Sequence, residues 1–202
     1  MPGLQRLLSF RSEVAVIPAA LVLALVVFHL AGADALDSLR YDRDAVLAGE
    51  AWRLVTGHLV HSDAIHLGWN LLGVVIVGFL FAGDYSPREW LVILLVSTAV
   101  TDLGFLLLEP QLEWYVGFSG VLHGLMAAGL VAWLRTSRDP VTWLVTALFV
   151  GKLAWEHYAG ALPFTAGSLS LPVVHEAHTY GAVGGLLAAL WLAHRSPQPA
   201  SL

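Results

Sequence analysis

The sequence predicts an all-α fold: a polytopic membrane protein built as a bundle of six transmembrane helices. Of the 202 residues, 57% are hydrophobic and only 12% are charged, whereas soluble domains carry about 25% charged residues. A helix needs about 20 apolar residues to cross roughly 30 Å of hydrocarbon. Six stretches meet that requirement: residues 13–32, 64–82, 89–108, 118–135, 141–160 and 177–194. We therefore expect residues 1–202 to form a single membrane domain.

The first apolar run, Val14 to Ala31, is too long for the h-region of a secretory signal, which spans about 7–15 residues. It is predicted to be a retained first span. The connections between spans are short except for two. Residues 33–63 form a long, charged first loop, and residues 161–176 form a second loop with Pro and Gly as helix breakers. The chain has no cysteine, which excludes disulfides and thiol chemistry.

Basic residues predict the orientation in the membrane, because cytoplasmic segments carry an excess of Lys and Arg. The side of the long first loop has most of the acidic residues and three arginines: Arg40, Arg43 and Arg53. The other side has six: Arg6, Arg11, Arg88, Arg135, Arg138 and Arg195. Both termini are therefore expected in the cytoplasm, and the long first loop is expected on the outer side.

Two polar residues stand at the outer ends of predicted spans, where burial in hydrocarbon is costly and marks functional positions. Ser119 lies at the start of the fourth span, within Gly117-Phe118-Ser119-Gly120, and His178 lies at the start of the sixth. A serine hydroxyl is a weak nucleophile until a base takes its proton. The imidazole of His178 is neutral near physiological pH and can be that base. The pattern predicts a serine hydrolase built inside the bilayer.

Glycines are predicted to bring these two helices together. Each helix carries a pair of glycines four residues apart: Gly120 and Gly124 in the fourth span, Gly181 and Gly185 in the sixth. Small residues at this spacing let the backbones of membrane helices approach closely. Gly117 permits a tight turn ahead of Ser119. We expect the contact to bring Ser119 within hydrogen-bond reach of His178.

Acyl transfer also needs hydrogen-bond donors aimed at the developing oxyanion. His66 and Asn70 lie four residues apart and hence on one face of the second span. Their side chains and the backbone amide of Ser119 are the predicted donors. No acidic partner for His178 is evident, because Glu176 is only two residues away and should point elsewhere. A Ser–His dyad is therefore expected.

These residues resemble the signature of the rhomboid family of intramembrane serine proteases. Four motifs occur in family order within residues of about 50–190: Trp52-Arg53, His61-x4-His66-x3-Asn70, Gly117-x-Ser119-Gly120 and Ala177-His178-x-x-Gly181-x-x-x-Gly185. The resemblance implies Ser119 as nucleophile and His178 as general base. It implies an oxyanion hole formed by His66, Asn70 and the Ser119 amide. It also implies single-pass membrane substrates that are cut near their outer membrane boundary.

Within the family, the short body and the pattern Gly117-x-Ser119-Gly120-x-x-His123-Gly124 look most like rhombosortases. That resemblance implies a bacterial inner membrane and substrates that end in a Gly-Gly motif, an apolar helix and a basic cluster. His123 lies one turn after Ser119 on the same face. There it could line a site for an amine that resolves the acyl-enzyme in place of water, or it could simply bond to a neighbouring helix. An ordinary rhomboid with other single-pass substrates is a further alternative.

The remaining polar residues are expected to be mainly structural. Four should hold the first loop in place, the guanidinium by serving backbone carbonyls or lipid phosphate: Trp52, Arg53, His58 and His61. Lys152 and Glu156, four residues apart, could pair within the fifth span. His157 and Asp102 have no assigned role. All four are either structural pairs or features that recognise polar elements of the substrate.

Three other classes of protein fit parts of the sequence. A catalytically silent rhomboid-like binding protein usually lacks the serine or the histidine, and both are present. A zinc protease needs two histidines four residues apart on one helical face, whereas His175 and His178 are three apart. A haem or ion carrier needs paired histidines on facing helices, and His29 and His194 lie far from the outer cluster. We expect no metal, cofactor or nucleic acid; the oligomeric state stays open.

Overall fold

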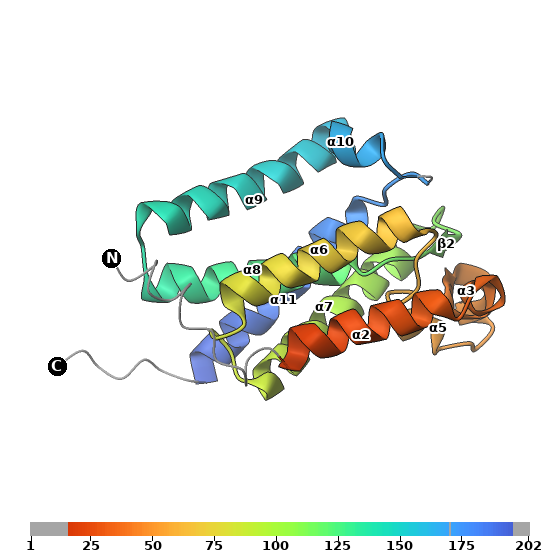
Figure 1. The fold of residues 1–202 in the computed structure, drawn as a ribbon, viewed down its shortest axis with the longest axis horizontal. Helices are drawn as coiled ribbons and strands as arrows, with labels where there is room; N and C mark the ends of the chain where they lie inside the picture. Colours follow the sequence, from red (N-terminus) through yellow and green to blue (C-terminus); the bar gives the residue numbers. More distant parts are fainter. Residues whose placement is uncertain (1–15, 170, 196–202) are drawn as a thin grey trace.

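Helix α8 (Ser119–Thr136) is the centre of the fold, with the other long helices arranged around it (Figure 1). The computed structural model describes residues 16–169 and 171–195. In this part of the chain, six helices have 15–22 residues: α2 (Val16–Leu30), α6 (Ala64–Phe81), α7 (Pro87–Leu108), α8, α9 (Pro140–Ala159) and α11 (Glu176–Arg195). Helices α6, α7 and α11 pack directly on α8, and α2 packs on α6. Helix α9 stands at the edge of the bundle (Figure 1).

The six long helices overlie the six predicted spans, and their ends differ from the predicted ones by three residues at most. Residues 13–15 of the first predicted span lie outside the described residues, as do Arg6 and Arg11. By length and composition, α6 and α7 are the described helices able to cross a membrane. Helix α2 and α3 (Ala33–Leu39), bent by 112°, add a third if the pair counts as one span. Six crossings therefore remain a prediction.

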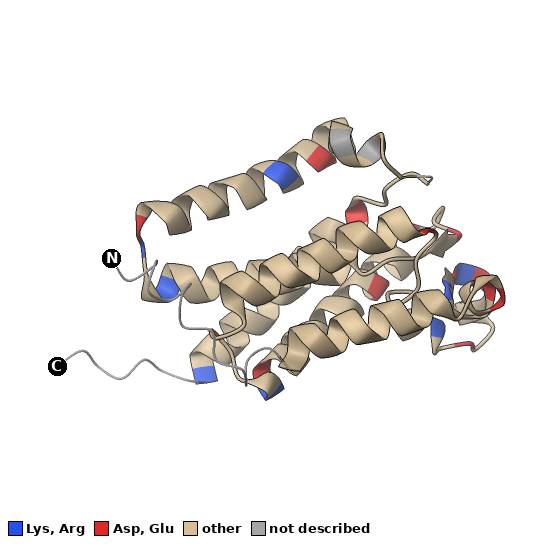
Figure 2. Cartoon of the chain, in the orientation of Figure 1, with Lys and Arg blue, Asp and Glu red and all other residues tan. Residues whose placement is uncertain are grey.

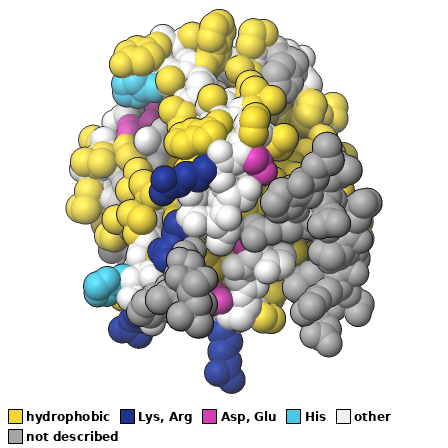
Figure 3. Space-filling model, turned by 90° about the vertical axis from the view of Figure 1, so that its left-hand side faces the viewer, with side chains coloured by type: hydrophobic (Ala, Val, Ile, Leu, Met, Phe, Trp, Pro, Cys, Tyr) yellow, Lys and Arg dark blue, Asp and Glu magenta, His cyan; other side chains and the backbone are white. Residues whose placement is uncertain are grey.

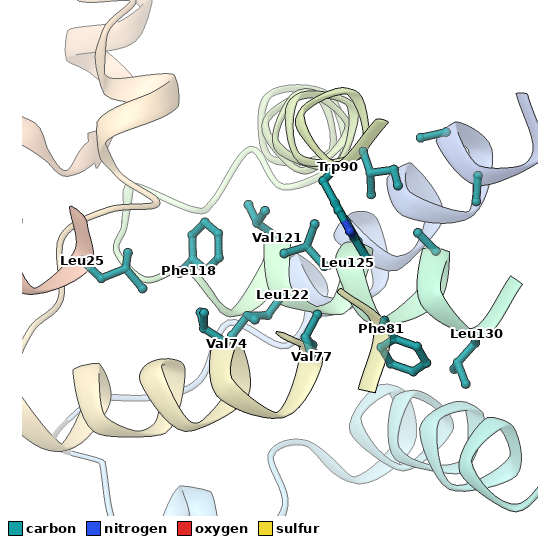
Figure 4. Close-up of a cluster of buried hydrophobic side chains, with 14 of the residues drawn as sticks. Leu25, Val74, Val77, Phe81, Trp90, Phe118, Val121, Leu122, Leu125 and Leu130 are labelled. Carbon is teal, nitrogen blue, oxygen red and sulfur yellow. The ribbon is translucent and has the colours of Figure 1, made fainter. Parts of the chain in front are cut away.

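An apolar core lies along α8 (Figure 4). Buried side chains from four helices and the turn before α8 meet there: Leu25 of α2, Val74 and Val77 of α6, Trp90 of α7, Phe118, and Val121, Leu122 and Leu125 of α8. Because neighbouring helices cover α8, small and polar residues along it face protein. The outer helices instead expose large apolar side chains, for example Leu23, Val75, Leu95, Leu148 and Leu187. So extensive an apolar exterior suits a lipid environment.

Two pairs of glycines let α8 and α11 touch backbone to backbone. A Cβ added to Gly181 would collide with the carbonyl oxygen of Gly120. A Cβ added to Gly185 would collide with the carbonyl oxygen of Gly124. The prediction that glycines bring these two helices together is confirmed, and the contact lies directly beside the N-terminal ends that carry Ser119 and His178.

Side-chain caps define the starts of two neighbouring helices. Asp63 precedes α6, and its carboxylate accepts hydrogen bonds from the amides of Ile65 and His66. Ser86 and Glu89 form a reciprocal capping box at the start of α7. The cap on α6 matters for function because it fixes the first turn, which carries His66.

The segment predicted as a long first loop contains short helices and one strand. Its elements are α3, β1 (Tyr41–Asp42), α4 (Arg43–Leu47) and α5 (Arg53–Thr56). Strand β1 pairs antiparallel with β2 (Trp114–Tyr115). The fold is mostly helical, as predicted, but this pairing was not predicted, because a strand of two residues has no periodicity to reveal it. The pairing ties the first loop to the segment that leads into Ser119.

Two arginines of this segment bind backbone carbonyls. Arg43 donates to the carbonyl of Phe105 at 2.9 Å, near the end of α7, where carbonyls have no partner within the helix. Arg53 donates to the carbonyls of Asp37 and Arg40, each at 2.9 Å. The predicted role of Arg53 as a loop anchor is confirmed. Both contacts hold the first loop against the end of the bundle that carries Ser119.

Charged residues collect at the two ends of the bundle (Figure 2). One end carries the first loop with its arginines and acids. The opposite end carries Arg88 in the first turn of α7, Arg135 in the last turn of α8 and Arg195 at the end of α11. Figure 3 looks onto this second end, where arginine side chains project among apolar ones. The described arginines therefore divide between the two ends as the sequence predicted.

The glycine contact makes a testable prediction. Gly181→Val should lower the free energy of unfolding by about 2–4 kcal/mol, because a branched side chain forces α11 away from α8. Gly151→Val is the matched control, since an added Cβ at this exposed position of α9 meets open space. It should cost less than about 1 kcal/mol. Thermal unfolding in detergent measures both, and equal melting temperatures for the two variants would contradict the backbone contact.

Candidate active site

Ser119 and His178 meet at the N-terminal ends of two adjacent helices. The hydroxyl Oγ of Ser119, in the first turn of α8, lies 2.9 Å from Nε2 of His178, in the first turn of α11. Ser119 is partly exposed, whereas His178 is buried. An unprotonated imidazole nitrogen at this distance accepts a hydrogen bond from the hydroxyl. The two residues therefore have the geometry of a nucleophile and its base.

The turn ahead of Ser119 requires glycine. Gly117 has φ of +117°, a backbone conformation that side chains of L-residues rarely adopt, and an added Cβ would lie 2.6 Å from the ring of His66. The amide of Gly117 donates to the carbonyl of Gly57 at 3.1 Å. Its own carbonyl accepts from the Tyr115 hydroxyl at 2.7 Å. Burial raises the pKa of Tyr115 to about 12, so that the hydroxyl keeps its proton and donates. No motif in the sequence pointed to Tyr115.

The first amides of α8 are available to an anion. The first hydrogen bond at the start of the helix joins the amide of Leu122 to the carbonyl of Phe118, so the amide of Ser119 has no partner within the helix. The amides at a helix N-terminus also lie at the positive end of its dipole. The Ser119 amide is thus a suitable donor to a negatively charged oxygen close to the hydroxyl of the same residue.

Asn70 and His66 lie on the neighbouring face of α6. Asn70 is buried, and its Nδ2 donates to the carbonyl of His66 at 3.0 Å. An amide nitrogen carries two hydrogens, so one remains for another acceptor. Both residues line the same cavity as Ser119.

The hydrogen bonds around His66 fix its tautomer. Ser62 donates its only hydroxyl hydrogen to Asp63 at 3.0 Å, so its oxygen accepts from Nδ1 of His66 at 3.2 Å. A neutral His66 therefore presents an unprotonated Nε2 toward Gly117. In this arrangement His66 can donate to an oxyanion only when the ring is protonated on both nitrogens.

His123 stacks on His178. The two ring centroids are 4.1 Å apart and the planes differ by 16°. Nδ1 of His123 lies 2.7 Å from the carbonyl of Ser119 and must donate to it, since a carbonyl only accepts. His123 also stacks on Phe149 of α9 at 5.9 Å. His123 thus packs against rings of two neighbouring helices, while its hydrogen bond is to a carbonyl of its own helix.

A carboxylate lies on the far side of His178, contrary to the expectation of an isolated dyad. Oε2 of Glu156, on α9, is 2.9 Å from Nδ1 of His178. The same oxygen accepts from Nζ of Lys152 at 2.6 Å, so the predicted pair within the fifth span is confirmed. Sequence spacing revealed the partner on the same helix but not the one on another helix. Glu176, as expected, points elsewhere, toward His175 at 3.6 Å.

A cavity of about 520 Å³ opens beside these groups. Ser119, His123 and Lys152 contribute polar atoms to its wall, while most of the lining is apolar and comes from α6, α8, α9 and the segment 162–174. Within that segment α10 (Pro163–Ala166) is a single short helix. Trp69 of α6 donates to the hydroxyl of Ser168 at 3.0 Å, which links this segment to α6 across the cavity. The cavity can hold an extended, apolar stretch of polypeptide.

The cluster does not have the geometry of a metal centre. Ligand atoms of His123, Glu156 and His178 lie within 4.8 Å of one another. However, the two rings are stacked nearly parallel, so a single ion cannot lie in the planes of both, and Lys152 already donates to the carboxylate. Within the described residues, the donor set fits proton transfer better than metal binding.

Three further histidines do not contact Ser119 or His178. His58 is buried, and its Nε2 lies 3.1 Å from Oδ1 of Asp102, which links the first loop to α7. His61 is buried and its ring meets that of His66 edge-on at 5.0 Å. The predicted role of His58 and His61 in holding the loop is consistent with these contacts. His157 is exposed and contacts Tyr158, and Asp102 has the buried partner that the sequence did not reveal.

Comparison with known protein families agrees with the mostly helical membrane fold. Residues 48–195, well over half of the chain, match the family model of the Rhomboid domain. The chain belongs to the rhomboid family. Rhomboids are intramembrane serine proteases that act on membrane proteins in the bilayer, although some members are inactive. The matched residues include α5 of the first loop and the glycine turn at Gly117. They also include the five long helices α6, α7, α8, α9 and α11.

The burial of His61 makes stability depend on pH. Burial and the neighbouring His66 lower the pKa of His61 to about 3, against 6.5 in an unfolded chain. Between these values the unfolded chain binds one more proton than the folded chain. The contribution of His61 to the free energy of unfolding is therefore fully present above pH 6.5 and falls by up to about 1.4 kcal/mol per pH unit as the pH drops toward 3. In His61→Gln the free energy of unfolding should fall less steeply with pH, because this proton no longer binds to the unfolded chain. Melting temperatures of both proteins from pH 4 to 7 measure it, and parallel curves would contradict a buried neutral His61.

Proposed function

We propose that this rhomboid is an active intramembrane serine endopeptidase in which Ser119 is the nucleophile and His178 is the general base. The observation that supports it most directly is the 2.9 Å contact between the Ser119 hydroxyl and Nε2 of His178 beside a large apolar cavity. Packing alone is a poor explanation for the pair, since placing a polar side chain such as the buried His178 in an apolar bundle is costly.

In the proposed reaction the Ser119 oxygen attacks the scissile carbonyl while its proton moves to Nε2 of His178. The resulting imidazolium then gives that proton to the leaving amine, and an acyl-enzyme ester remains on Ser119. A second nucleophile resolves the ester. It is water in hydrolysis or an amine in transfer, and His123 lies close enough to Ser119 to border the position of either.

The developing oxyanion needs donors at the start of α8. We propose the Ser119 amide and the free hydrogen of the Asn70 amide as the principal donors, and His66 as the third. The hydrogen bond between Ser62 and Nδ1 of His66 favours the tautomer without a proton on Nε2. His66 therefore contributes a donor in its protonated form and otherwise shapes the hole through its contact with Gly117.

The proposed substrates are single-pass membrane proteins with a C-terminal anchor, cut near the outer boundary of a bacterial inner membrane. The resemblance of Gly117-x-Ser119-Gly120-x-x-His123-Gly124 to rhombosortases supports a Gly-Gly cleavage segment. A glycine pair also leaves a helix easily and bends without steric cost, so that its carbonyl can reach Ser119. The excess of arginines at the end of the bundle opposite Ser119 supports cytoplasmic termini and an outward-facing site.

The first experiment is Ser119→Ala. It should abolish cleavage of a tailed Gly-Gly reporter and labelling by a fluorophosphonate, because no other described group combines a hydroxyl with a base at 2.9 Å in this cavity. The variant should express and melt as the wild type does. A reporter with Gly-Gly replaced by Leu-Leu separates a rhombosortase from an ordinary rhomboid. Equal activity and labelling in wild type and Ser119→Ala would favour a catalytically silent rhomboid-like binding protein.

The second experiment tests the oxyanion donors. Asn70→Leu keeps a similar volume and removes the amide, and it should lower kcat by roughly 100- to 1,000-fold with little change in KM. Stability should be nearly preserved, because Oδ1 of Asn70 is buried without a hydrogen-bond partner among the described residues. Steady-state kinetics on the reporter measure the effect. A kcat within threefold of wild type would remove Asn70 from the oxyanion hole.

A further inference from the structure

Glu156 contacts the edge of the His178 ring opposite the edge that faces the serine. Its carboxylate is 3% exposed, and Oε2 lies 2.9 Å from Nδ1 of His178 while Nε2 of the same ring lies 2.9 Å from Ser119. The contact crosses from α9 to α11, two helices that otherwise meet little. Ser119, His178 and Glu156 therefore form a line of two hydrogen bonds that runs through three helices.

The hydrogen bonds assign the tautomer of His178. An ionised carboxylate only accepts, so Nδ1 must carry the proton and Nε2 must present its lone pair to the serine hydroxyl. Nζ of Lys152 also lies 3.4 Å from Nδ1, but a lysine only donates, and its shorter contact of 2.6 Å is to Glu156. Without the carboxylate, Lys152 could donate to Nδ1, and the proton would then sit on Nε2, where it prevents His178 from acting as a base.

The lysine keeps the carboxylate ionised and in place. A single buried carboxylate in an apolar bundle would become neutral. Lys152 lies one turn away on the same helix, with its side chain 27% exposed, and holds Oε2 at 2.6 Å. The negative charge therefore persists beside His178 and stabilises the imidazolium that forms when the ring takes a proton.

We propose that Glu156 is a positioning residue that extends the Ser119–His178 pair to a triad, with Lys152 holding its charge and rotamer. This inference rests on the proposed function. During the reaction the proton on Nδ1 stays on Nδ1; Glu156 orients the ring and stabilises its charge and is not itself protonated. The carboxylate comes from α9, so the base is correctly set only when α9 lies against the rest of the site.

The test compares carboxylate variants in the full-length protein. Glu156→Gln should lower kcat and the rate of fluorophosphonate labelling of Ser119 by at least about 100-fold, with KM changed by less than about threefold. In this variant the amide oxygen of the new side chain accepts the hydrogen bond from Lys152, and the NH2 group donates to Nδ1 of His178, which moves the ring proton to Nε2. Lys152→Gln combined with Glu156→Gln removes both charges together, which protects folding, and should lose a similar factor. Glu176→Gln is the matched control, since this carboxylate is only two residues from His178 in the sequence but contacts His175; the variant should behave as wild type.

A spectroscopic measurement reads the tautomer without relying on activity. In ¹⁵N-histidine NMR spectra of wild type, His178 should show a protonated Nδ1 and an unprotonated Nε2, and Glu156→Gln should reverse that assignment. Wild type that reacts with the probe, together with Glu156→Gln that reacts equally fast, overturns the positioning role alone. Wild type with the proton on Nε2 of His178 overturns it as well. Wild type that neither cleaves nor labels overturns the proposed function, and the triad's role with it.

Discussion

The contact between the backbones of α8 and α11 is the constraint on which the rest of the structure depends. Glycines at 120 and 181 let the two helices touch near their N-terminal ends, where a hydroxyl from one meets an imidazole from the other. Even an alanine at position 181 would collide with the backbone of Gly120 and force the helices apart, whereas a Cβ at position 120 would lie 3.0 Å from the carbonyl oxygen of Ala177 and need only a small shift. The same contact leaves α9 outside the packed core, with space beside the serine for the cavity.

Polar groups in this apolar bundle are arranged in chains of hydrogen bonds. Lys152, Glu156, His178 and Ser119 form one chain, and Asp63, Ser62 and His66 form another. Each chain has an ionisable end that fixes which nitrogen of its histidine carries the proton. In a low-dielectric surrounding such bonds are strong, and leaving one member unpaired is costly. The hydrogen bonds around each histidine, rather than the histidine alone, thus determine which ring nitrogen donates and which accepts.

The sequence predicted the helices and the glycine contact, because both follow from local patterns: apolar runs of sufficient length and small residues four apart. It also predicted the pairing of Lys152 with Glu156, since four residues make one helical turn. It did not predict Glu156 beside His178, because the fifth span has no comparable pair of glycines to indicate which helix it lies against. It also missed Tyr115, whose hydroxyl holds the carbonyl of Gly117 through a pairing of two-residue strands. The six membrane crossings and the cytoplasmic location of both termini remain predictions from composition.

The most direct measurement is an experimental structure of the protein after reaction with a fluorophosphonate. The account predicts phosphorus bonded to Oγ of Ser119, the imidazole of His178 within hydrogen-bond reach of it, and the phosphoryl oxygen accepting from the Ser119 amide. The backbones of α8 and α11 should still touch at Gly120 and Gly181. A probe attached to another residue, or Ser119 and His178 on separated helices, would contradict the account.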